Sequence, residues 1–171
     1  MKVIAILVQS IDGKIAKDSN DTLNWVSSVD RKFFREQTTK AGVILMGQTT
    51  YENIEKPLPN RLNIILTPNP DQYKDIIQKG LLEFTNIDLN DLLKDLQNRG
   101  FDTVFIGGGR YVYTQFLTES LLDEIWISTE PVILGSGMSA FNTKNSIMKK
   151  VHVIETFDLG DNVMVTKYSC R

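Results

Sequence analysis

The sequence predicts an α/β layered fold with a mostly parallel central sheet and antiparallel strands at its C-terminal end. Short apolar runs alternate with segments of helical periodicity through most of the 171 residues, a pattern typical of helices that cover a parallel sheet. The last apolar stretches flank Gly160-Asp161-Asn162, as in a hairpin. The length, without linker or internal repeat, predicts one domain over residues 1–171.

In the first half of the chain, apolar runs bracketed by breakers predict the strands. The run over residues 3–8 is continuous, as expected of a strand buried on both faces. Ser27 and Ser28 offer N-caps for a helix. The expected elements are a strand over 3–8, a turn over 10–14, a loop over 17–24, a helix over 29–40, a strand over 42–47, a helix over 49–54, a proline-containing turn over 56–60 and a strand over 61–67.

In the second half, leucines at 89, 92, 93 and 96 lie on one face of a helix. Tyr111, Val112, Phe116 and Leu117 also recur at helical spacing, directly after an apolar run and three glycines. The expected elements are a strand over 81–84, a helix over 89–97, a strand over 103–106, a helix beginning near 110, a strand over 125–128 and the hairpin over 151–169.

Composition excludes several classes of partner. A net charge of −2 gives no reason to expect nucleic acid. No apolar run approaches membrane-spanning length and the apolar start lacks the flanks of a signal peptide, so no membrane is expected. Cys170 is the single cysteine and His152 the single histidine, so we expect a cytoplasmic protein without disulfide or metal site.

The glycines at 107–109 follow an apolar strand and precede a helix. Glycine costs about 1 kcal/mol relative to alanine in a helix interior, so three in a row indicate a need for bare backbone. They do not form a Rossmann fingerprint, because the third glycine position falls on Val112. On the glycines alone, a tight turn and a phosphate cradle at a helix N-terminus are equally good explanations.

Asp30 lies in the first turn of its predicted helix and also has two interpretations. A carboxylate there opposes the positive end of the helix, worth about 0.3–1 kcal/mol, and this interpretation is favoured by itself. However, Asp30, Phe34 and Gln37 lie on one helix face. A carboxylate beside a phenyl ring suits a flat, nitrogen-bearing heterocycle, which it can bind through ring N–H or amino groups.

Arg61 begins a buried strand directly after Pro57-Leu58-Pro59-Asn60. Most arginines are surface groups, but a rigid turn holds this one in a fixed place. Its planar guanidinium is therefore a candidate anchor for a carboxylate or phosphate.

Three stretches resemble dihydrofolate reductases. MGQTTYENIEKPLPNRLNIILT is similar to their central segment, WVSSVDRKFFREQT to the stretch that holds their active-site carboxylate, and IGGGRYVYTQFL to their cofactor segment, with one extra residue around Tyr111. Asp30 falls on the position of the carboxylate. The stretches keep the order and approximate spacing of the family over residues 1–128.

The ends of the chain resemble a sister group. SIDGKIA, LLDEIWIS and PVILGSGMSAF look like the reductase domain of riboflavin biosynthesis, the C-terminal part of the deaminase-reductase RibD, and no deaminase zinc motif precedes them. The resemblance implies a stand-alone domain with the dihydrofolate reductase-like three-layer α/β/α fold. That fold has a central, mostly parallel mixed sheet and a C-terminal antiparallel hairpin.

The resemblance also implies roles for individual residues. Asp30 would bind and polarise the substrate ring, Phe34 would cover it, Ser128 would support Asp30, and Arg61 would hold an anionic tail of the substrate. The cofactor NADPH would be bound by Ala16, Gly47, Gln48, Thr49, Thr50, Leu66, Thr67, Gly107, Gly108, Gly109 and Arg110. Gln48 stands where these enzymes often carry a basic residue, which weakens recognition of the 2′-phosphate.

The implied function is NADPH-dependent transfer of hydride to a small heterocyclic substrate of the pyrimidine or pterin type, as in 5-amino-6-(5-phosphoribosylamino)uracil reductase. The alternatives are a dihydrofolate or other pteridine reductase, and a nucleotide-binding protein that keeps the fold without catalysis. RibD-type domains pair, so the resemblance also implies a homodimer.

Overall fold

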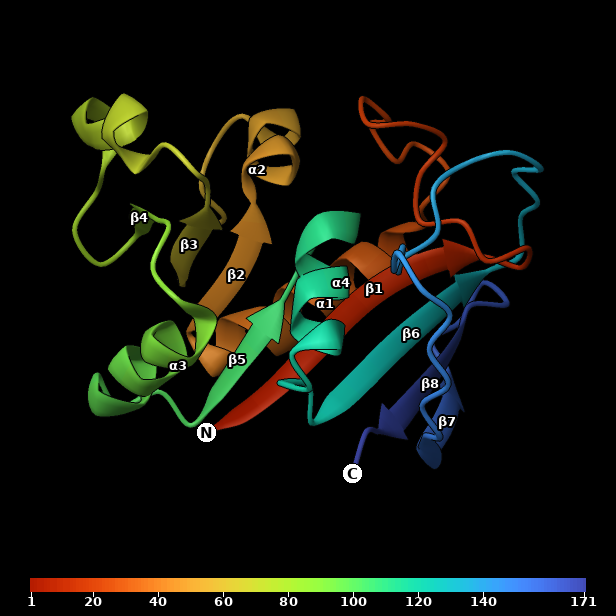
Figure 1. Cartoon of the computed structure of the whole chain (residues 1–171). Coiled ribbons are helices and arrows are strands. Elements are labelled where there is room, and N and C mark those ends of the chain that lie inside the picture. Colours follow the sequence, from red (N-terminus) through yellow and green to blue (C-terminus); the bar gives the residue numbers. More distant parts are fainter.

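The computed structural model describes residues 1–171 and contains an eight-stranded sheet in the order β4-β3-β2-β5-β1-β6-β8-β7 (Figure 1). The strands are β1 (Lys2–Ser10), β2 (Val43–Gly47), β3 (Leu62–Leu66), β4 (Leu82–Thr85), β5 (Thr103–Ile106), β6 (Glu124–Glu130), β7 (His152–Asp158) and β8 (Met164–Ser169). The helices are α1 (Ser28–Ala41), α2 (Gln48–Ile54), α3 (Leu89–Asn98), α4 (Arg110–Thr118) and the 3₁₀ helix η1 (Pro70–Ile76).

The sheet is parallel from β4 to β6 and antiparallel at its other end. β1 pairs in parallel with both β5 and β6, and β2 pairs in parallel with β3 and β5. β8 pairs antiparallel with β6 and with β7, and the two edge strands of the sheet are β4 and β7. The predicted mostly parallel sheet with a C-terminal hairpin is therefore confirmed.

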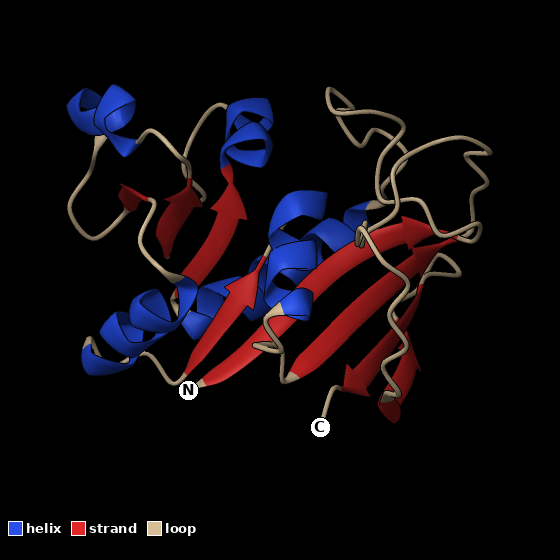
Figure 2. Ribbon diagram, in the orientation of Figure 1, coloured by secondary structure: helices blue, strands red, loops and turns tan.

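Helices cover both faces of the sheet, which gives three layers (Figure 2). On one face, Phe33 of α1 packs with Ile4, Ile44 and Phe105 of the sheet. On the other face, α3 and α4 pack against the sheet, with Phe116 fully buried at the centre. Each large apolar side chain buried in this way contributes about 1.5–3 kcal/mol.

Local signals set the ends of α1. The Ser27 side chain caps its N-terminus by accepting from the backbone N–H of Asp30, and Gly42 ends it in the left-handed conformation, with φ 77°. β3 begins one residue later than expected, at Leu62, so Arg61 lies just before the strand. The 3₁₀ helix η1 is an addition, because no element was predicted over residues 70–76.

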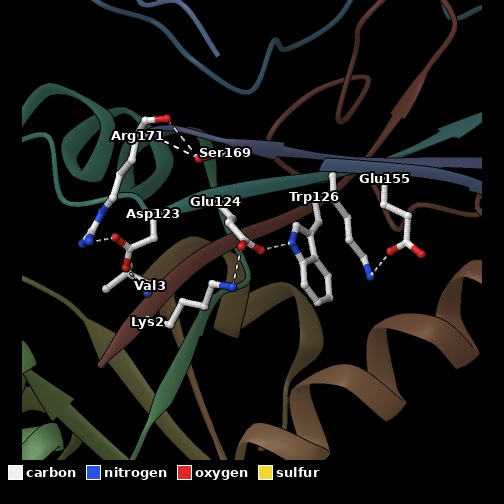
Figure 3. Close-up of polar contacts among 9 residues, drawn as sticks. Lys2, Val3, Asp123, Glu124, Trp126, Glu155, Ser169 and Arg171 are labelled. Carbon is white, nitrogen blue, oxygen red and sulfur yellow. Dashed lines mark hydrogen bonds and ion pairs between the residues drawn. The ribbon is translucent and has the colours of Figure 1, made fainter. Parts of the chain in front are cut away.

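The amino and carboxyl ends of the parallel strands form two edges of different character. At the amino edge, ion pairs of Lys2 with Glu124 and of Arg171 with Asp123 hold the two chain ends beside β6 (Figure 3). At the carboxyl edge, the loops over 11–24 and 131–140 lie side by side (Figure 1). The Ile15 N–H donates to the Met138 carbonyl and the Met138 N–H donates to the Ala16 carbonyl, each at 2.8 Å. None of the helices has the length and apolar character needed to cross a bilayer.

Candidate active site

A cavity of about 1210 Å³ opens at the carboxyl edge of the parallel strands. Ligand sites of open parallel sheets usually lie at this edge. The ends of five strands contribute to its lining, through residues 6–8, Gly47, residues 66–68, residues 85–87 and residues 107–109. The first half of α1 and the start of α4 complete the walls.

The cavity brings together all the residues predicted for the site except Ser128. Its lining includes Ala16, Asp30, Phe34, Gly47, Gln48, Thr49, Thr50, Arg61, Leu66, Thr67, Gly107, Gly108, Gly109 and Arg110. Ser128 lies behind Asp30 on β6 and is 2% exposed. Residues from distant parts of the sequence therefore share one cavity.

The three glycines meet different physical demands. A Cβ at Gly107 would lie 2.6 Å from Ile44 Cδ1, so this glycine allows β5 to pack closely on β2. Gly108 has φ +121°, a conformation that side chains disfavour. The backbone N–H groups of Gly108 and Gly109 form no hydrogen bond within the backbone and lie at the start of α4. The segment is a tight turn whose free N–H groups lie in the lining of the cavity.

A second turn touches the first. The Gly47 N–H donates to the Gly108 carbonyl at 2.7 Å, and α2 begins directly after Gly47. A Cβ at Gly47 would lie 3.1 Å from Val112 Cγ2, and one at Gly109 would lie 3.0 Å from Thr50 Oγ1. Two helix N-termini thus approach the same part of the cavity, an arrangement that favours an anion.

Asp30 is a buried carboxyl group, 6% exposed. Burial raises its pKa, a hydrogen bond from the Ser128 side chain lowers it, and the negative charge of Glu130 raises it again. The balance lies above the ordinary value, so burial and the charge of Glu130 outweigh the hydrogen bond from Ser128 and the positive charge of Arg31. A carboxyl group with a raised pKa inside a cavity is a candidate for acid–base chemistry.

Sequence reasoning missed Tyr113, which is 4% exposed and lines the cavity. Its hydroxyl donates to the Ile6 carbonyl at 2.8 Å. Burial and the negative charge of Asp30 raise the pKa of Tyr113, so the phenol stays protonated. In the sequence, Tyr113 is one apolar position of an amphipathic helix, and no signal separates it from a core residue.

Arg61 lies at another part of the cavity, 5% exposed. Its Nε donates to the Pro59 carbonyl at 3.0 Å and one terminal nitrogen donates to the Thr38 hydroxyl. Burial, followed by the positive charge of Arg35, lowers the pKa of Arg61. Neither arginine forms an ion pair with a carboxylate. Arg35, which sequence reasoning also missed, makes this region a candidate anion subsite.

Gln48 is held in a hydrogen-bond network. Its Oε1 accepts from the Thr67 hydroxyl at 2.6 Å, and its Nε2 donates to Glu52 at 2.9 Å. Tyr73 also donates to Glu52, at 2.7 Å. Hydrogen bonds from Tyr73 and Gln48 lower the pKa of Glu52, so an ionised carboxylate lies one hydrogen bond from this part of the cavity.

The fold and the cavity together define an α/β protein in which two helix N-termini and a buried carboxyl group line one cavity. A family model described as dihydrofolate reductase matches residues 2–130. The chain belongs to the dihydrofolate reductase family.

Sequence relatives support this assignment. The chain is 26% identical over 153 residues to the YwjB protein of Bacillus subtilis, covering 82% of this chain and 83% of that protein. It is 29% identical over 123 residues to the dihydrofolate reductase of Haemophilus influenzae, covering 72% of this chain and 68% of that enzyme.

Solved structures share the fold over the whole chain. A putative riboflavin biosynthesis protein from Shewanella sp. PV-4 is 25% identical with a TM-score of 0.75, covering 99% of this chain and 98% of the other. RibD of Acinetobacter baumannii is 20% identical with a TM-score of 0.82 and is covered over 57% of its length. Dihydrofolate reductase from Enterococcus faecalis, complexed with NADP(H), is 24% identical with a TM-score of 0.73, covering 98% and 95% of the two chains.

Proposed function

We propose that the protein is an NADPH-dependent reductase that transfers hydride to a pyrimidine or pterin-type substrate, with the phosphoribosylamino-uracil of riboflavin biosynthesis as the leading substrate. One observation carries the proposal: Asp30, a buried carboxyl group, and the unpaired N–H groups of the 107–109 turn lie in the same cavity. Family membership and the likeness to riboflavin-type proteins support it.

The residues that would hold the dinucleotide fit an extended anion. Gly108, Gly109 and the start of α4 would bind its phosphates through backbone N–H groups, and the turn at Gly47 would bind them from the other side. Leu66 and Thr67 would contact the adenosine, and Ala16 the nicotinamide. When bound, the nicotinamide supplies the hydride.

Asp30 would bind the substrate ring and assist protonation. Its carboxyl group can hydrogen bond to ring N–H and amino groups while Phe34 packs on the ring face. Reduction of a C=N bond requires a proton at the nitrogen, and the raised pKa of Asp30 keeps a proton available at higher pH than a free aspartate would. Ser128 would support this carboxyl group through a hydrogen bond, and Tyr113 lines the cavity beside it.

Arg61, with Arg35 beside it, would hold the anionic tail of the substrate. One terminal nitrogen of Arg61 has no protein partner and remains available for a ligand. The phosphate of a phosphoribosyl group and the carboxylates of a folate tail could both bind here. The choice of substrate therefore depends on the ring and on the length of the tail.

The proposal is tested by NADPH consumption with a panel of heterocycles. The purified protein is mixed with NADPH and, in separate reactions, with the phosphoribosylamino-uracil, dihydrofolate and other pterins. We expect substrate-dependent loss of NADPH absorbance, greatest with the phosphoribosylamino-uracil. Turnover with dihydrofolate or another pterin alone would favour the pteridine reductase alternative.

A thermal shift with NADPH separates loss of catalysis from loss of cofactor binding, because a ligand that binds only the folded state raises the melting temperature. Stabilisation by NADPH without turnover of any compound in the panel would favour a nucleotide-binding protein. No stabilisation by NADPH or NADH would remove the cofactor assignment.

We also infer a homodimer, because the riboflavin-type reductase domains that the chain resembles pair. The free edge strand β7 supports this inference, since Val153 and Ile154 are 63% and 51% exposed there. Sedimentation at micromolar concentration should give a mass of two chains, and a mass of one chain would contradict it.

A further inference from the structure

A second buried carboxylate, Glu130, lies close to Asp30 and has no part in the function proposed above. Glu130 is the last residue of β6, two positions beyond Ser128, and is 3% exposed. No lysine or arginine pairs with it. A buried carboxylate without a cation is costly unless hydrogen bonds compensate for its lost hydration.

Those hydrogen bonds come from one residue, Ser27. Glu130 Oε1 accepts from the Ser27 backbone N–H at 2.8 Å and from the Ser27 hydroxyl at 2.7 Å. Because the hydroxyl proton points at Glu130, the lone pairs of the oxygen are left for the backbone N–H of Asp30, which donates at 3.3 Å. Glu130 therefore holds Ser27 in place, and Ser27 in turn holds the first turn of α1.

Glu130 also acts on Asp30 through its charge. The polar and charged groups that act on Asp30 are Arg31 on α1 and Ser128 and Glu130 on β6, and Asp30 in turn acts on Tyr113 of α4. After burial, the charge of Glu130 is the other cause that raises the pKa of Asp30, whereas Ser128 and Arg31 lower it.

We propose that Glu130 is a positioning residue for Asp30, holding the first turn of α1 through Ser27 and presenting a negative charge to the Asp30 carboxyl group. A helix cap alone does not account for a carboxylate here. The Ser27 hydroxyl caps the helix by itself, and a neutral acceptor would suffice to hold Ser27. The negative charge has an additional effect only on a neighbouring titratable group.

The charge is tested without substrate, by following the carboxyl carbon of Asp30 by ¹³C NMR as the pH changes. Glu130→Gln keeps an oxygen acceptor for Ser27 and removes the charge. We expect the pKa of Asp30 to fall by about one pH unit in this variant, the size of effect that a nearby like charge produces.

Glu124→Gln is the matched control. Glu124 lies on the same strand and, three alternations away, on the same face, but at the opposite edge of the sheet, where it contacts Lys2 and Trp126 (Figure 3). The pKa of Asp30 should not change in this variant. An unchanged pKa in Glu130→Gln, or an equal fall in both variants, would overturn the proposal.

Turnover gives a second readout, which rests on the proposed reductase activity. In Glu130→Gln, the fall of kcat/KM with rising pH should begin about one pH unit lower than in the wild type. If the NMR shift is found but no substrate is reduced by the wild type, the proposed function fails and the role of Glu130 stands.

Ser27 variants cover the case in which Glu130→Gln does not fold. Ser27→Ala removes the link and keeps the Glu130 charge, whereas Ser27→Thr keeps the hydroxyl. We expect Ser27→Ala to lower kcat at least about threefold and Ser27→Thr to restore it to within about twofold, as for loss and return of one neutral hydrogen bond. Equal kcat in both variants, with loss of stability in Ser27→Ala, would leave Ser27 as a helix cap and overturn the link.

Discussion

Asp30 is subject to two opposing influences. Its place in the first turn of α1 favours the ionised form, because the helix N-terminus is positive. Its burial favours the neutral form and is the largest cause of the raised pKa of Asp30. Asp91, which occupies the corresponding position of α3, is exposed and pairs with Lys94 at 3.2 Å. At the same helix position, Asp30 is therefore a buried carboxyl group in a cavity, whereas Asp91 is an exposed one that stabilises a helix end.

Asp30→Asn should therefore be stable and much less active than the wild type. A raised folded-state pKa means that Asp30 contributes stability below its unfolded pKa and loses that contribution as pH rises through the folded value. Replacing it with a neutral amide should keep or raise the melting temperature at neutral pH. We expect kcat/KM to fall at least about tenfold, a transition-state cost of about 1.4 kcal/mol.

Asp91→Asn is the control for this variant. It should lower stability by a few tenths of a kcal/mol, as expected for an exposed carboxylate at a helix start, and leave kcat/KM unchanged. Activity of Asp30→Asn within about twofold of wild type on the true substrate would return Asp30 to a purely structural role.

Arg61→Lys should affect both binding and stability. Lysine keeps the charge but loses the planar fork that donates to the Pro59 carbonyl and the Thr38 hydroxyl. We expect a rise in KM of about tenfold and a loss of about 1–3 kcal/mol, measured by steady-state kinetics and urea unfolding.

Arg99→Lys is the control for the fork, because Arg99 binds Glu83 through two nitrogens, at 2.9 and 2.8 Å, outside the cavity. This variant should leave KM unchanged. A stable Arg61→Lys with wild-type KM would remove Arg61 from the substrate site.

At the scale of elements, we expect the start of α2 to govern the choice between NADPH and NADH. Gln48 carries no charge and is bound to Glu52, so this element offers nothing that distinguishes a 2′-phosphate from a hydroxyl. Gln48→Arg should raise the NADPH-to-NADH ratio of kcat/KM at least about tenfold, because a charge-assisted hydrogen bond to phosphate is worth about 1.5–3 kcal/mol.

Gln115→Arg provides a matched comparison. Gln115 also lines the cavity and donates to a glutamate four residues later, Glu119, at 3.3 Å, but on α4. Gln115→Arg should change the NADPH-to-NADH ratio of kcat/KM much less than Gln48→Arg does. An unchanged ratio in Gln48→Arg would show that the adenosine lies elsewhere.

Asp12 joins two loops at the cavity, one over residues 11–24 and the other over residues 131–140. Its carboxylate accepts from the N–H groups of Leu134 and Gly135, at 3.1 and 2.8 Å. Hydrogen bonds from the Ser10 side chain and from Leu134 lower the pKa of Asp12 to about 2. The contribution of a lowered pKa is present above the unfolded value and is lost as pH falls through the folded one.

Asp12→Asn should loosen these loops, because it replaces charge-assisted hydrogen bonds with neutral ones. We expect faster amide hydrogen exchange over residues 131–140 at neutral pH, and unchanged exchange in β2. Exchange in the loop equal to that of wild type would contradict a role for Asp12 in holding it.

The sequence predicts an element's boundary best where the signal for that boundary is local. The glycines at 107–109 and the N-cap Ser27 mark their turns directly, because backbone geometry restricts the residue type. Arg35, Tyr113 and Glu130 could not be placed, because their contacts depend on how distant elements pack. Their residue types are ordinary for a helix surface, a helix core and a strand end.

At the scale of the whole molecule, no single element forms the site. β1 and β6 carry the residues behind Asp30, β5 and α4 form the glycine turn, and α1 brings Phe34 to the same cavity. Parallel pairing aligns the carboxyl ends of these strands, so turns that are far apart in sequence meet at one edge. The proposed reductase activity requires both the cofactor and the substrate in this one cavity.

The most direct test of that account is transfer of deuterium from NADPH that carries two deuterons at the nicotinamide C4. After incubation with the substrate selected from the panel, the product is analysed by mass spectrometry. We predict a single deuterium in the product with the wild type and at least about tenfold slower labelling with Asp30→Asn. A product without deuterium, or no product although NADPH raises the melting temperature, would contradict the proposal that this cavity carries out reduction.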